Sequence, residues 1–510
     1  MMRRYSRNLA VALLLSAVPF ERSGGAPAPL PAPFSFETLR QRAAALAASA
    51  YRPEPNRVPD ELKKLNYEGY QQIRFLPDTA PWQDQALPFT FQFFFPGYLY
   101  QDGVLIHLLN EGRVNDFPFS PNDFDYGTNR FPQAPPGDLK FAGLRILYLL
   151  NSPQKQDEVA SFVGASYYRL LGAGQRYGIS ARALAIDTAE PTGEEFPRLT
   201  EFWVQRPAQA ATQLEFFALL DSPRAAGAYR FLLKPGKITV MDVEAHLFLR
   251  KEIRKLGIAP LTSMFLVGAN RTRFVPDFRP EVHDSDGLLI ETAGGEWQWR
   301  PLLNPDKAHH VSPFAADNVK GFGLLQRHRN FQDYEDLVAR FDLRPNLWVE
   351  PRASWGPGVI ELVEIPTGTE WNDNIVAYWV PKEQADPGHE FHYAYSQSAS
   401  LSDPPRPPLW RAQSTRIDPP RDNRPPRFLI DFTGPGPVPS APAGPVAAKV
   451  EASRGEVRNL VTERNEVSGG WRVFFDLIAP GTDAVELRAA LCSGEKRLSE
   501  TWIYHWIPYR

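Results

Sequence analysis

The sequence predicts an all-β protein, and three observations lead to that prediction. Short apolar runs that alternate with polar residues recur along most of the 510 residues, which is typical of half-buried strands. Helical periodicity is clear at one place only, near residues 35–50, and strands do not alternate with helices as they do in α/β proteins. The 50 prolines also disfavour long helices. We therefore expect a large, mostly antiparallel β-sandwich.

The first expected element is the helix at residues 35–50, with Ser35 as its N-cap and an apolar face that contains Leu39 and Ala43. A hairpin is expected where residues 98–100 and 104–106 flank an Asp-Gly pair, which favours a tight turn. Other expected strands are residues 89–93, 144–149, 216–220, 229–233, 238–243, 245–249 and 264–267.

The composition changes near Ser396, and residues 402–427 are dense in proline and arginine. Such a segment is either a linker between domains or an extended edge strand. The expected strands beyond it are residues 428–432, 446–451, 470–477, 484–491 and 498–505. Their length and spacing are typical of an immunoglobulin-like sandwich, and the single Cys492 excludes the disulfide-bonded version. The expected boundaries are 1–26 export signal, 27–400 main sandwich, 401–425 linker and 426–510 C-terminal domain.

The N-terminus has the features of an export signal. Three arginines within the first seven residues precede an apolar run at residues 9–20, which is too short to cross a bilayer. Small residues at 23–26 suit cleavage, so we expect a mature protein that begins between residues 23 and 33 and resides in the periplasm. An uncleaved anchor and a twin-arginine signal are the alternatives. The net charge of -3 gives no indication of nucleic-acid or anionic-membrane binding.

Residues 361–379 (ELVEIPTGTEWNDNIVAYW) contain the first of two polar loops that attract attention. Both ends of this stretch alternate like strands, and the loop between them carries Glu370, Trp371 and Asp373. A carboxyl group beside an indole, in a place that excludes water, can keep its proton near neutral pH. The simpler interpretation is an ordinary turn.

The second polar loop is residues 281–287 (EVHDSDG), which includes His283 and Asp284. It is either a plain turn or an acidic calcium loop, although the ligand spacing of an EF-hand is missing. Two carboxylates on separate loops are what glycoside hydrolysis requires, one as acid and one as base. Nearby tryptophans could stack on sugar rings, although each is more often a core residue: Trp297, Trp299, Trp348, Trp355 and Trp371.

Other kinds of site are disfavoured by the sequence. It contains no G-x-S-x-G nucleophile motif and no H-E-x-x-H motif, and residues 389–392 (HEFH) have the wrong spacing for zinc on a helix. Residues 172–178 (GAGQRYG) look like a dinucleotide-binding loop. However, the third glycine falls one place late and no helix pattern follows, which favours a glycine-rich turn. We expect no cofactor and no metal requirement.

Long stretches of the chain, among them NYEGYQQIRF (66–75), LLDSPRAAGAYRF (219–231), RPEVHDSDGL (279–288) and residues 361–379, resemble the periplasmic glucan biosynthesis proteins G and D of Gram-negative bacteria, and G more than D. The resemblance implies a galactose-mutarotase-like sandwich followed by an immunoglobulin-like domain. It also implies a part in making osmoregulated periplasmic glucans, whose backbone is β-1,2-linked glucose.

Three activities are compatible with the resemblance. The first is an inverting, endo-acting hydrolase of β-1,2-glucan. The second is a transglycosylase that cyclises or branches the glucan, and the third is a non-catalytic glucan-binding partner of the inner-membrane glucosyltransferase. None of them involves nucleic acid or stable membrane insertion after removal of the signal.

The resemblance also assigns residues. Asp373 would be the general acid, and Asp284 the general base, acting through water and a substrate hydroxyl group. Glu370 and Arg344 match positions that line the substrate cleft, and Phe341 stands where relatives have a cleft tyrosine. We expect the neighbouring Trp371 and His283 to contact the sugar as well.

Overall fold

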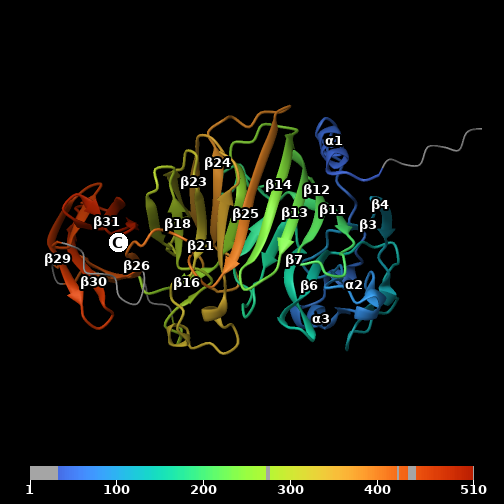
Figure 1. Cartoon of the computed structure of the whole chain (residues 1–510), viewed down its shortest axis with the longest axis horizontal. Coiled ribbons are helices and arrows are strands. Elements are labelled where there is room, and N and C mark those ends of the chain that lie inside the picture. Colours follow the sequence, from blue (N-terminus) through green and yellow to red (C-terminus); the bar gives the residue numbers. More distant parts are fainter. Residues whose placement is uncertain (1–32, 271–275, 422–423, 435–443, 509–510) are drawn as a thin grey trace, which may run out of the picture. The chain divides into compact units, whose positions relative to one another are not determined.

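Strands dominate the computed structural model, which describes residues 33–270, 276–421, 424–434 and 444–508 (Figure 1). The all-β prediction is therefore confirmed. The expected export signal, residues 1–26, lies outside the described residues. The chain divides into Met1–Pro33 and Phe34–Arg510, and the described helices and strands lie in the second part. Within the described ranges, no helix has the length and apolar character needed to span a membrane.

The expected N-terminal helix is present as α1 (Phe36–Ala47). Its N-cap is Ser35, whose hydroxyl accepts a hydrogen bond from the Thr38 N–H at 3.1 Å. The apolar face of α1 packs on Trp203 and Phe217, on the outer side of a sheet. The other helical segments are short: α2 (Asp60–Lys63), α3 (Tyr67–Gln72), η1 (Pro77–Thr79), η2 (Gln83–Gln85), η3 (Pro121–Asp123), η4 (Phe331–Asp333) and η5 (Phe341–Leu343).

The first large sheet is antiparallel throughout the pairs described. Its strands are, in spatial order, β2 (Phe89–Phe94), β6 (Gly143–Ser152), β7 (Lys155–Val163), β8 (Tyr167–Leu170), β9 (Ser180–Arg182), β15 (Leu256–Ser263), β24 (Ile375–Pro381), β23 (Gly358–Glu364) and β20 (His310–Ala315), with β10 (Leu184–Ile186) also beside β15.

The second large sheet continues from the main sandwich into the C-terminal part. Its strands are, in spatial order, β28 (Ala447–Ala452), β31 (Val485–Ser493), β33 (Thr501–Trp506), β19 (Trp297–Pro301), β18 (Gly287–Glu291), β21 (Gly321–Leu325), β22 (Asn346–Pro351), β25 (Glu390–Ser400), β14 (Thr239–Leu249), β13 (Ala225–Lys234), β12 (Leu214–Asp221), β11 (Arg198–Gln205), β3 (Leu105–Asn110) and β4 (Arg113–Phe117), with β32 (Lys496–Arg497) beside β31. The pairs β3–β11 and β19–β33 are parallel.

The remaining strands form small sheets: β1 (Arg74–Phe75) with β5 (Phe124–Asp125), β16 (Phe265–Val267) with β17 (Val282–His283), and the series β26 (Arg411–Asp418), β27 (Arg427–Thr433), β30 (Gly470–Ile478) and β29 (Glu456–Asn465).

The two large sheets enclose the main hydrophobic core. Strand β2 illustrates why, because Phe89, Phe91 and Phe93 are buried and the residues between them are not. Strand β14 alternates in the same way, with Val243, Ala245 and other residues of its inner face in the same core. The expected strands 238–243 and 245–249 are thus one continuous strand whose outer face stays partly exposed.

The hairpin expected at residues 98–106 is wrong. Tyr98 adopts a left-handed backbone conformation with φ of 52°, and Gly97 pairs with Tyr100 in a local turn. Val104 pairs instead with Phe141, and the strand that follows it lies between β4 and β11. The Asp-Gly pair does not form the expected hairpin turn, because the strand that follows it pairs with β4 and β11 and not with residues 98–100.

The C-terminal strands expected from the sequence are all found, as β27, β28, β30, β31 and β33. Residues 411–418, within the expected linker, form the edge strand β26, which agrees with the alternative interpretation of this segment. Strand β33 extends the second large sheet beside β19, and Trp299 and Trp502 belong to one hydrophobic cluster. Whether residues 426–510 also fold by themselves stays a prediction.

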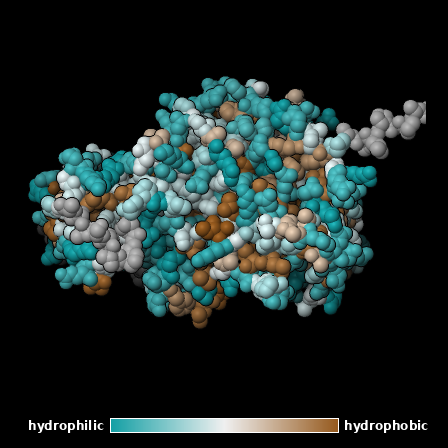
Figure 2. Space-filling view, viewed as in Figure 1, coloured by the Kyte–Doolittle hydropathy of each residue, from teal (hydrophilic) through white to brown (hydrophobic). Residues whose placement is uncertain are grey.

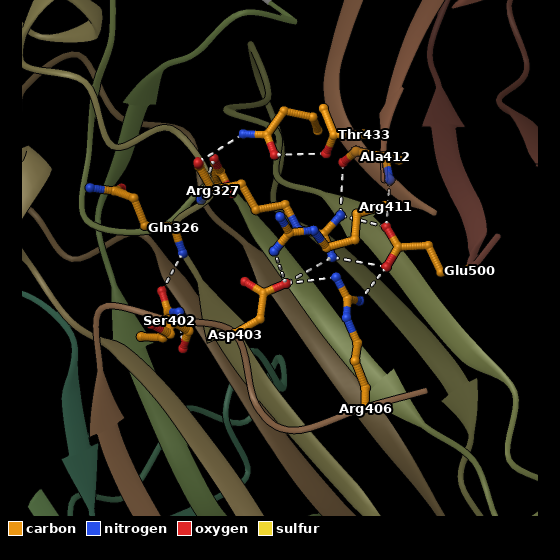
Figure 3. A network of polar contacts seen from close by, with 12 residues as sticks. Gln326, Arg327, Ser402, Asp403, Arg406, Arg411, Ala412, Thr433 and Glu500 are labelled. Atoms are coloured by element: carbon orange, nitrogen blue, oxygen red, sulfur yellow. Dashed lines mark hydrogen bonds and ion pairs between the residues drawn. The ribbon is translucent and has the colours of Figure 1, made fainter. Parts of the chain in front are cut away.

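A buried polar network ties the C-terminal strands to the end of β21 (Figure 3). The side chain of Arg327 is 1% exposed and that of Glu500 is fully buried, and an Arg327 Nη2–Glu500 Oε2 hydrogen bond of 2.9 Å joins them. Arg406 donates to Glu500 Oε2 at 2.6 Å and to Asp403 at 2.7 Å. The guanidinium carbon of Arg327 also lies 3.5 Å from the centre of the Trp299 ring. Glu500 and Asp403 together balance the two buried guanidinium groups, and Glu500 contacts both of them.

We expect Glu500→Gln to lower the free energy of unfolding by about 3 kcal/mol or more, because it removes the fully buried one of the two negative charges that compensate Arg327 and Arg406. Asp431→Asn is a matched control, since Asp431 also pairs with two arginines, Arg416 and Arg472, whose side chains are 54% and 36% exposed. The control should cost about 1 kcal/mol or less. Urea unfolding of both variants measures the difference, and equal losses would contradict the prediction.

Candidate active site

Asp373 lies at the end of the loop that joins the paired strands β23 and β24, as the sequence predicted. The next residue, Asn374, holds this loop in place and is 1% exposed. Its Oδ1 accepts a hydrogen bond from the Phe265 N–H at 2.8 Å. Its Nδ2 donates to the carbonyl oxygens of Phe265 and Ile365, both at 3.0 Å. The amide of Asn374 therefore fixes the position of Asp373 relative to β16.

Asp284 follows β17 directly and is attached to the same segment. Its backbone N–H donates to the Met264 carbonyl at 2.9 Å, and the hydroxyls of Ser263 and Ser285, both fully buried, are 2.7 Å apart. The two candidate aspartates thus come from loops that are distant in sequence and are both hydrogen-bonded to residues 263–265.

The side chain of Asp284 is almost completely buried and accepts a hydrogen bond from Arg344. Burial raises the pKa of Asp284, while the positive charges of Arg344, Arg169 and His283 oppose that rise. This environment restrains the rise that burial alone would cause, and so favours the ionised form more than a purely apolar pocket would.

Asp373 differs from Asp284 in both exposure and contacts. It remains accessible to solvent, and among the described residues no hydrogen-bond partner of its carboxyl group is found. Desolvation by the surrounding protein raises its pKa, and the charge of Asp284 raises it further. Because this mutual effect requires proximity, the two carboxyl groups lie near each other, and the charges of Arg169 and Arg344 oppose the rise in the pKa of Asp373 as well.

Glu370 and Trp371 occupy the outer part of the same loop. Glu370 accepts a hydrogen bond from Arg279 at 2.8 Å, and Arg279 also donates to Asp336 at 2.8 Å and to Asp277 at 2.7 Å. Arg279 therefore connects the loop of Glu370 to its own segment and to that of Asp336. Trp371 is 85% exposed, so its indole is available to a ligand.

Two of the residues expected to contact sugar are buried instead. The ring of Phe341 is 1% exposed and lies 4.1 Å from the guanidinium carbon of Arg344, which it supports from below. His283 is fully buried, with its ring nitrogens 2.8 Å from Gln326 Oε1 and 2.7 Å from Glu281 Oε2. Neither ring is accessible to a ligand in this structure.

The other tryptophans singled out in the sequence are core residues. Trp297, Trp299 and Trp348 are buried in the cluster shared with the C-terminal strands. Trp355 is buried in the main sandwich, against Trp379. The more common of the two interpretations given above therefore holds for these four.

Sequence reasoning missed a cavity of about 600 Å³ that Arg169 helps to line. Five tyrosines line it: Tyr67, Tyr70, Tyr98, Tyr100 and Tyr177. A volume of this size is typical of ligand sites. Arg169 lines the cavity, contacts the ring of Tyr177, and acts electrostatically on both Asp284 and Asp373. It therefore connects the tyrosine-lined cavity to the two carboxyl groups.

The glycine-rich segment at residues 172–178 is a turn, as expected, and it helps to build this region. It is followed by β9 rather than by a helix. The Arg176 N–H donates to the Leu343 carbonyl at 3.0 Å. A Cβ on Gly178 would come within 2.8 Å of the Cβ of Arg344, so only glycine allows this close approach.

A second group of titratable residues lies behind Asp284. Glu281 Oε2 is 2.7 Å from His283 Nε2 and 2.7 Å from His328 Nδ1. These are hydrogen-bond distances, whereas donor atoms around a tetrahedral zinc ion would be roughly 3.4 Å apart. The two histidines lower the pKa of Glu281 to about 2, against the effect of burial. Hydrogen bonding and the charge of Glu281 raise the pKa of His328 to about 9, also against burial.

Known proteins resemble this chain over nearly its whole length. Residues 34–506 match the family described as "Periplasmic glucan biosynthesis protein, MdoG". The chain belongs to this family. The glucans biosynthesis protein G of Rhodopseudomonas palustris is 45% identical over 476 residues, which cover 93% of this chain and 94% of the relative.

Two further relatives with the same description give similar values. The protein of Pseudomonas paraeruginosa is 45% identical over 487 residues, covering 92% of each chain. That of Ralstonia nicotianae is 45% identical over 482 residues, covering 92% of this chain and 95% of the relative. The family resemblance expected from the sequence, including its preference for G, is confirmed.

The ion pair between His328 and Glu281 predicts a pH dependence of stability. The pKa of His328 is about 9 in the fold, against an ordinary value of 6.5, so its charge stabilises the fold fully below about pH 6.5. This contribution is lost as the pH rises through about 9. In His328→Asn, which cannot become charged, the unfolding free energy should depend less on pH between these limits, by about 2–3 kcal/mol.

Denaturant unfolding at a series of pH values measures this dependence. The matched control is His389→Asn, because the His389 side chain is 53% exposed and pairs only with an exposed glutamate. The control should retain the pH dependence of the unsubstituted protein, and parallel curves for His328→Asn and the unsubstituted protein would refute the assignment.

Proposed function

We propose that this protein is a periplasmic hydrolase of β-1,2-glucan that acts within the chain, inverts the anomeric configuration and serves the biosynthesis of osmoregulated periplasmic glucans. The family supports the glucan role. The observation that carries the proposed hydrolytic activity is the proximity of two carboxyl groups: Asp373 is accessible and has no hydrogen-bond partner within the described part of the chain, and Asp284 is buried against Arg344.

Asp373 is the general acid in this proposal. A raised pKa lets a carboxyl group keep its proton until the glycosidic oxygen departs, and an accessible position lets it reach that oxygen. The hydrogen bonds of Asn374 hold the backbone beside it, so the acid is presented from a rigid support.

Asp284 is the general base. In an inverting reaction the base accepts a proton from the attacking water, and the two carboxyl groups stand far enough apart to admit that water. Because Asp284 is buried, the proton would reach it through water or through a substrate hydroxyl group. Arg344 favours the ionised form that this role requires.

The cavity and loop residues provide the binding surface. Aromatic faces are suited to stacking on sugar rings, and five tyrosines line the cavity connected to the aspartates by Arg169. Glu370 and the exposed Trp371, on the loop of Asp373, offer a hydrogen-bond acceptor and a further aromatic face.

Incubation of purified protein with linear β-1,2-glucan tests the proposal. We expect shorter linear products, an increase in reducing ends and, by proton NMR at early times, the α-anomer from a β-linked substrate. Activity should persist in a chelator. Cyclic products without new reducing ends would identify a transglycosylase, and binding without a change in chain length would identify a glucan-binding partner of the glucosyltransferase. Either result would overturn the hydrolase proposal.

Asp373→Asn and Asp284→Asn should each lower kcat by about 10²–10⁴-fold with little change in substrate binding, because the geometry is kept while proton transfer is lost. The control Asp483→Asn, at a side chain that is 85% exposed, should have normal turnover. Initial rates and glucan binding by calorimetry provide the measurements. Near-normal turnover of Asp373→Asn would show that its loop is a simple turn without a catalytic role.

Arg344→Gln should move the pH–rate profile to higher pH. The positive charge of Arg344 opposes the rise in pKa of both Asp284 and Asp373, so both pKa values should increase when that charge is removed. The acidic limb of the profile reports ionisation of the base, and the alkaline limb reports loss of the proton from the acid. Both limbs then move to higher pH. Arg416→Gln is the exposed control. A uniform loss of activity with an unchanged profile would show that Arg344 serves binding alone.

A further inference from the structure

The outer face of the second large sheet carries a pair of histidines on adjacent strands. His246 of β14 and His392 of β25 are directly opposite each other, and their rings stack with centroids 4.3 Å apart. Glu244 lies on the same face as His246, because side chains two residues apart on a strand point the same way. Figure 2 shows mainly hydrophilic residues over β14 and β25 on the side that Figure 1 presents.

The spacing of the three donor atoms is that of metal ligands. Glu244 Oε1 is 3.7 Å from His246 Nε2 and 3.4 Å from His392 Nε2, and the three atoms lie within 4.8 Å of one another. Ligand atoms about 2.0–2.2 Å from a tetrahedral zinc ion are roughly 3.4 Å apart. The contrast with the Glu281 cluster, where the corresponding distances are 2.7 Å, is direct.

The tautomer of His246 is set by a neighbouring carboxylate. His246 Nδ1 lies 2.8 Å from Glu390 Oε1, so this nitrogen donates and Nε2 presents its lone pair toward the other two donor atoms. Glu390 is in turn held by Arg40 of α1, whose Nη1 donates to its two oxygens at 3.0 and 2.8 Å. A carboxylate that orients a histidine ligand in this way is the usual outer shell of a metal site.

The charges that face the site favour a cation. Arg230 of β13 lies 3.6 Å from the other oxygen of Glu244 and leaves Oε1 directed at the histidines. Within the described residues, the charged side chains linked to the histidine pair through these ion pairs are four acids and two bases: Glu37, Glu215, Glu244, Glu390, Arg40 and Arg230. With neutral histidines this is an excess of two negative charges, the charge of one divalent ion.

We propose that Glu244, His246 and His392 bind a divalent transition-metal ion of the Zn²⁺ type, with the remaining coordination position open to water. Two nitrogen ligands and one carboxylate suit zinc and its neighbours rather than calcium or magnesium, which prefer oxygen ligands alone. The ion joins β14 to β25, and through Glu390 and Arg40 it also secures α1 on the sheet. The site shares no residue with the candidate active site around Asp284 and Asp373.

Calorimetric titration of the purified, untagged full-length protein with ZnCl₂ tests this site. We expect one equivalent to bind, and Co²⁺ in its place to give the visible absorption of a low-symmetry site with histidine ligands. His392→Gln, at a side chain that is 52% exposed, should weaken Zn²⁺ binding by at least about ten-fold. His389→Gln, at a neighbouring exposed histidine that points to Glu383, should bind as the unsubstituted protein does.

A second variant separates ligation from a general effect on the surface. Glu390→Gln keeps all three ligands and removes only the outer-shell carboxylate, so it should weaken binding by about ten-fold while the Co²⁺ spectrum keeps its shape. The proposal is overturned if the unsubstituted protein binds no stoichiometric Zn²⁺. It is also overturned if His392→Gln and His389→Gln bind Zn²⁺ equally well.

Discussion

The hydrogen bonds between Asn374 and Phe265 are the constraint on which the site depends. Asn374 belongs to the turn between β23 and β24, while Phe265 begins the strand that leads to the loop of Asp284. A primary amide is well suited to this position because it can donate and accept at once and so satisfy a backbone N–H and a backbone carbonyl together. Without it, the loops of Asp373 and Asp284 would be related only through the pairing of β24 with β15.

The electrostatic surroundings of Asp284 and Asp373 follow from where those loops meet. Asp284 lies under the protein surface, where desolvation opposes its charge, and three cationic groups reduce that opposition. Asp373 is surrounded by protein but open to solvent, and the nearer negative charge acts on it in the same direction as desolvation. Both aspartates therefore have a raised pKa, and Asp284 differs in accepting a hydrogen bond from Arg344.

Local patterns predicted the local features, and tertiary pairing decided the rest. The strands on both sides of the Asp373 loop were predictable because residues 361–364 and 375–379 alternate and lie close together in the sequence. The hairpin at residues 98–106 was wrong because its strand pairs with β11, about a hundred residues later, for which local sequence gives no signal. The burial of His283 and the neighbourhood of Arg169 also depend on sheet packing, which residue type alone does not reveal. The pairing of His246 with His392 is a matter of register between distant strands.

The parallel pairing of β33 with β19 has a consequence for how the chain matures. Residues 302–500 lie between these strands, so during synthesis the outer edge of β19 stays without its neighbour until all of them have been made. Contacts of such wide separation form late and slowly in folding. The hydrophobic cluster around Trp299 and Trp502 and the pocket for the Arg327 side chain are equally incomplete until then. A polypeptide that cannot close its sheet early remains incompletely folded for longer, with the unpaired edge of β19 exposed to other chains in the meantime.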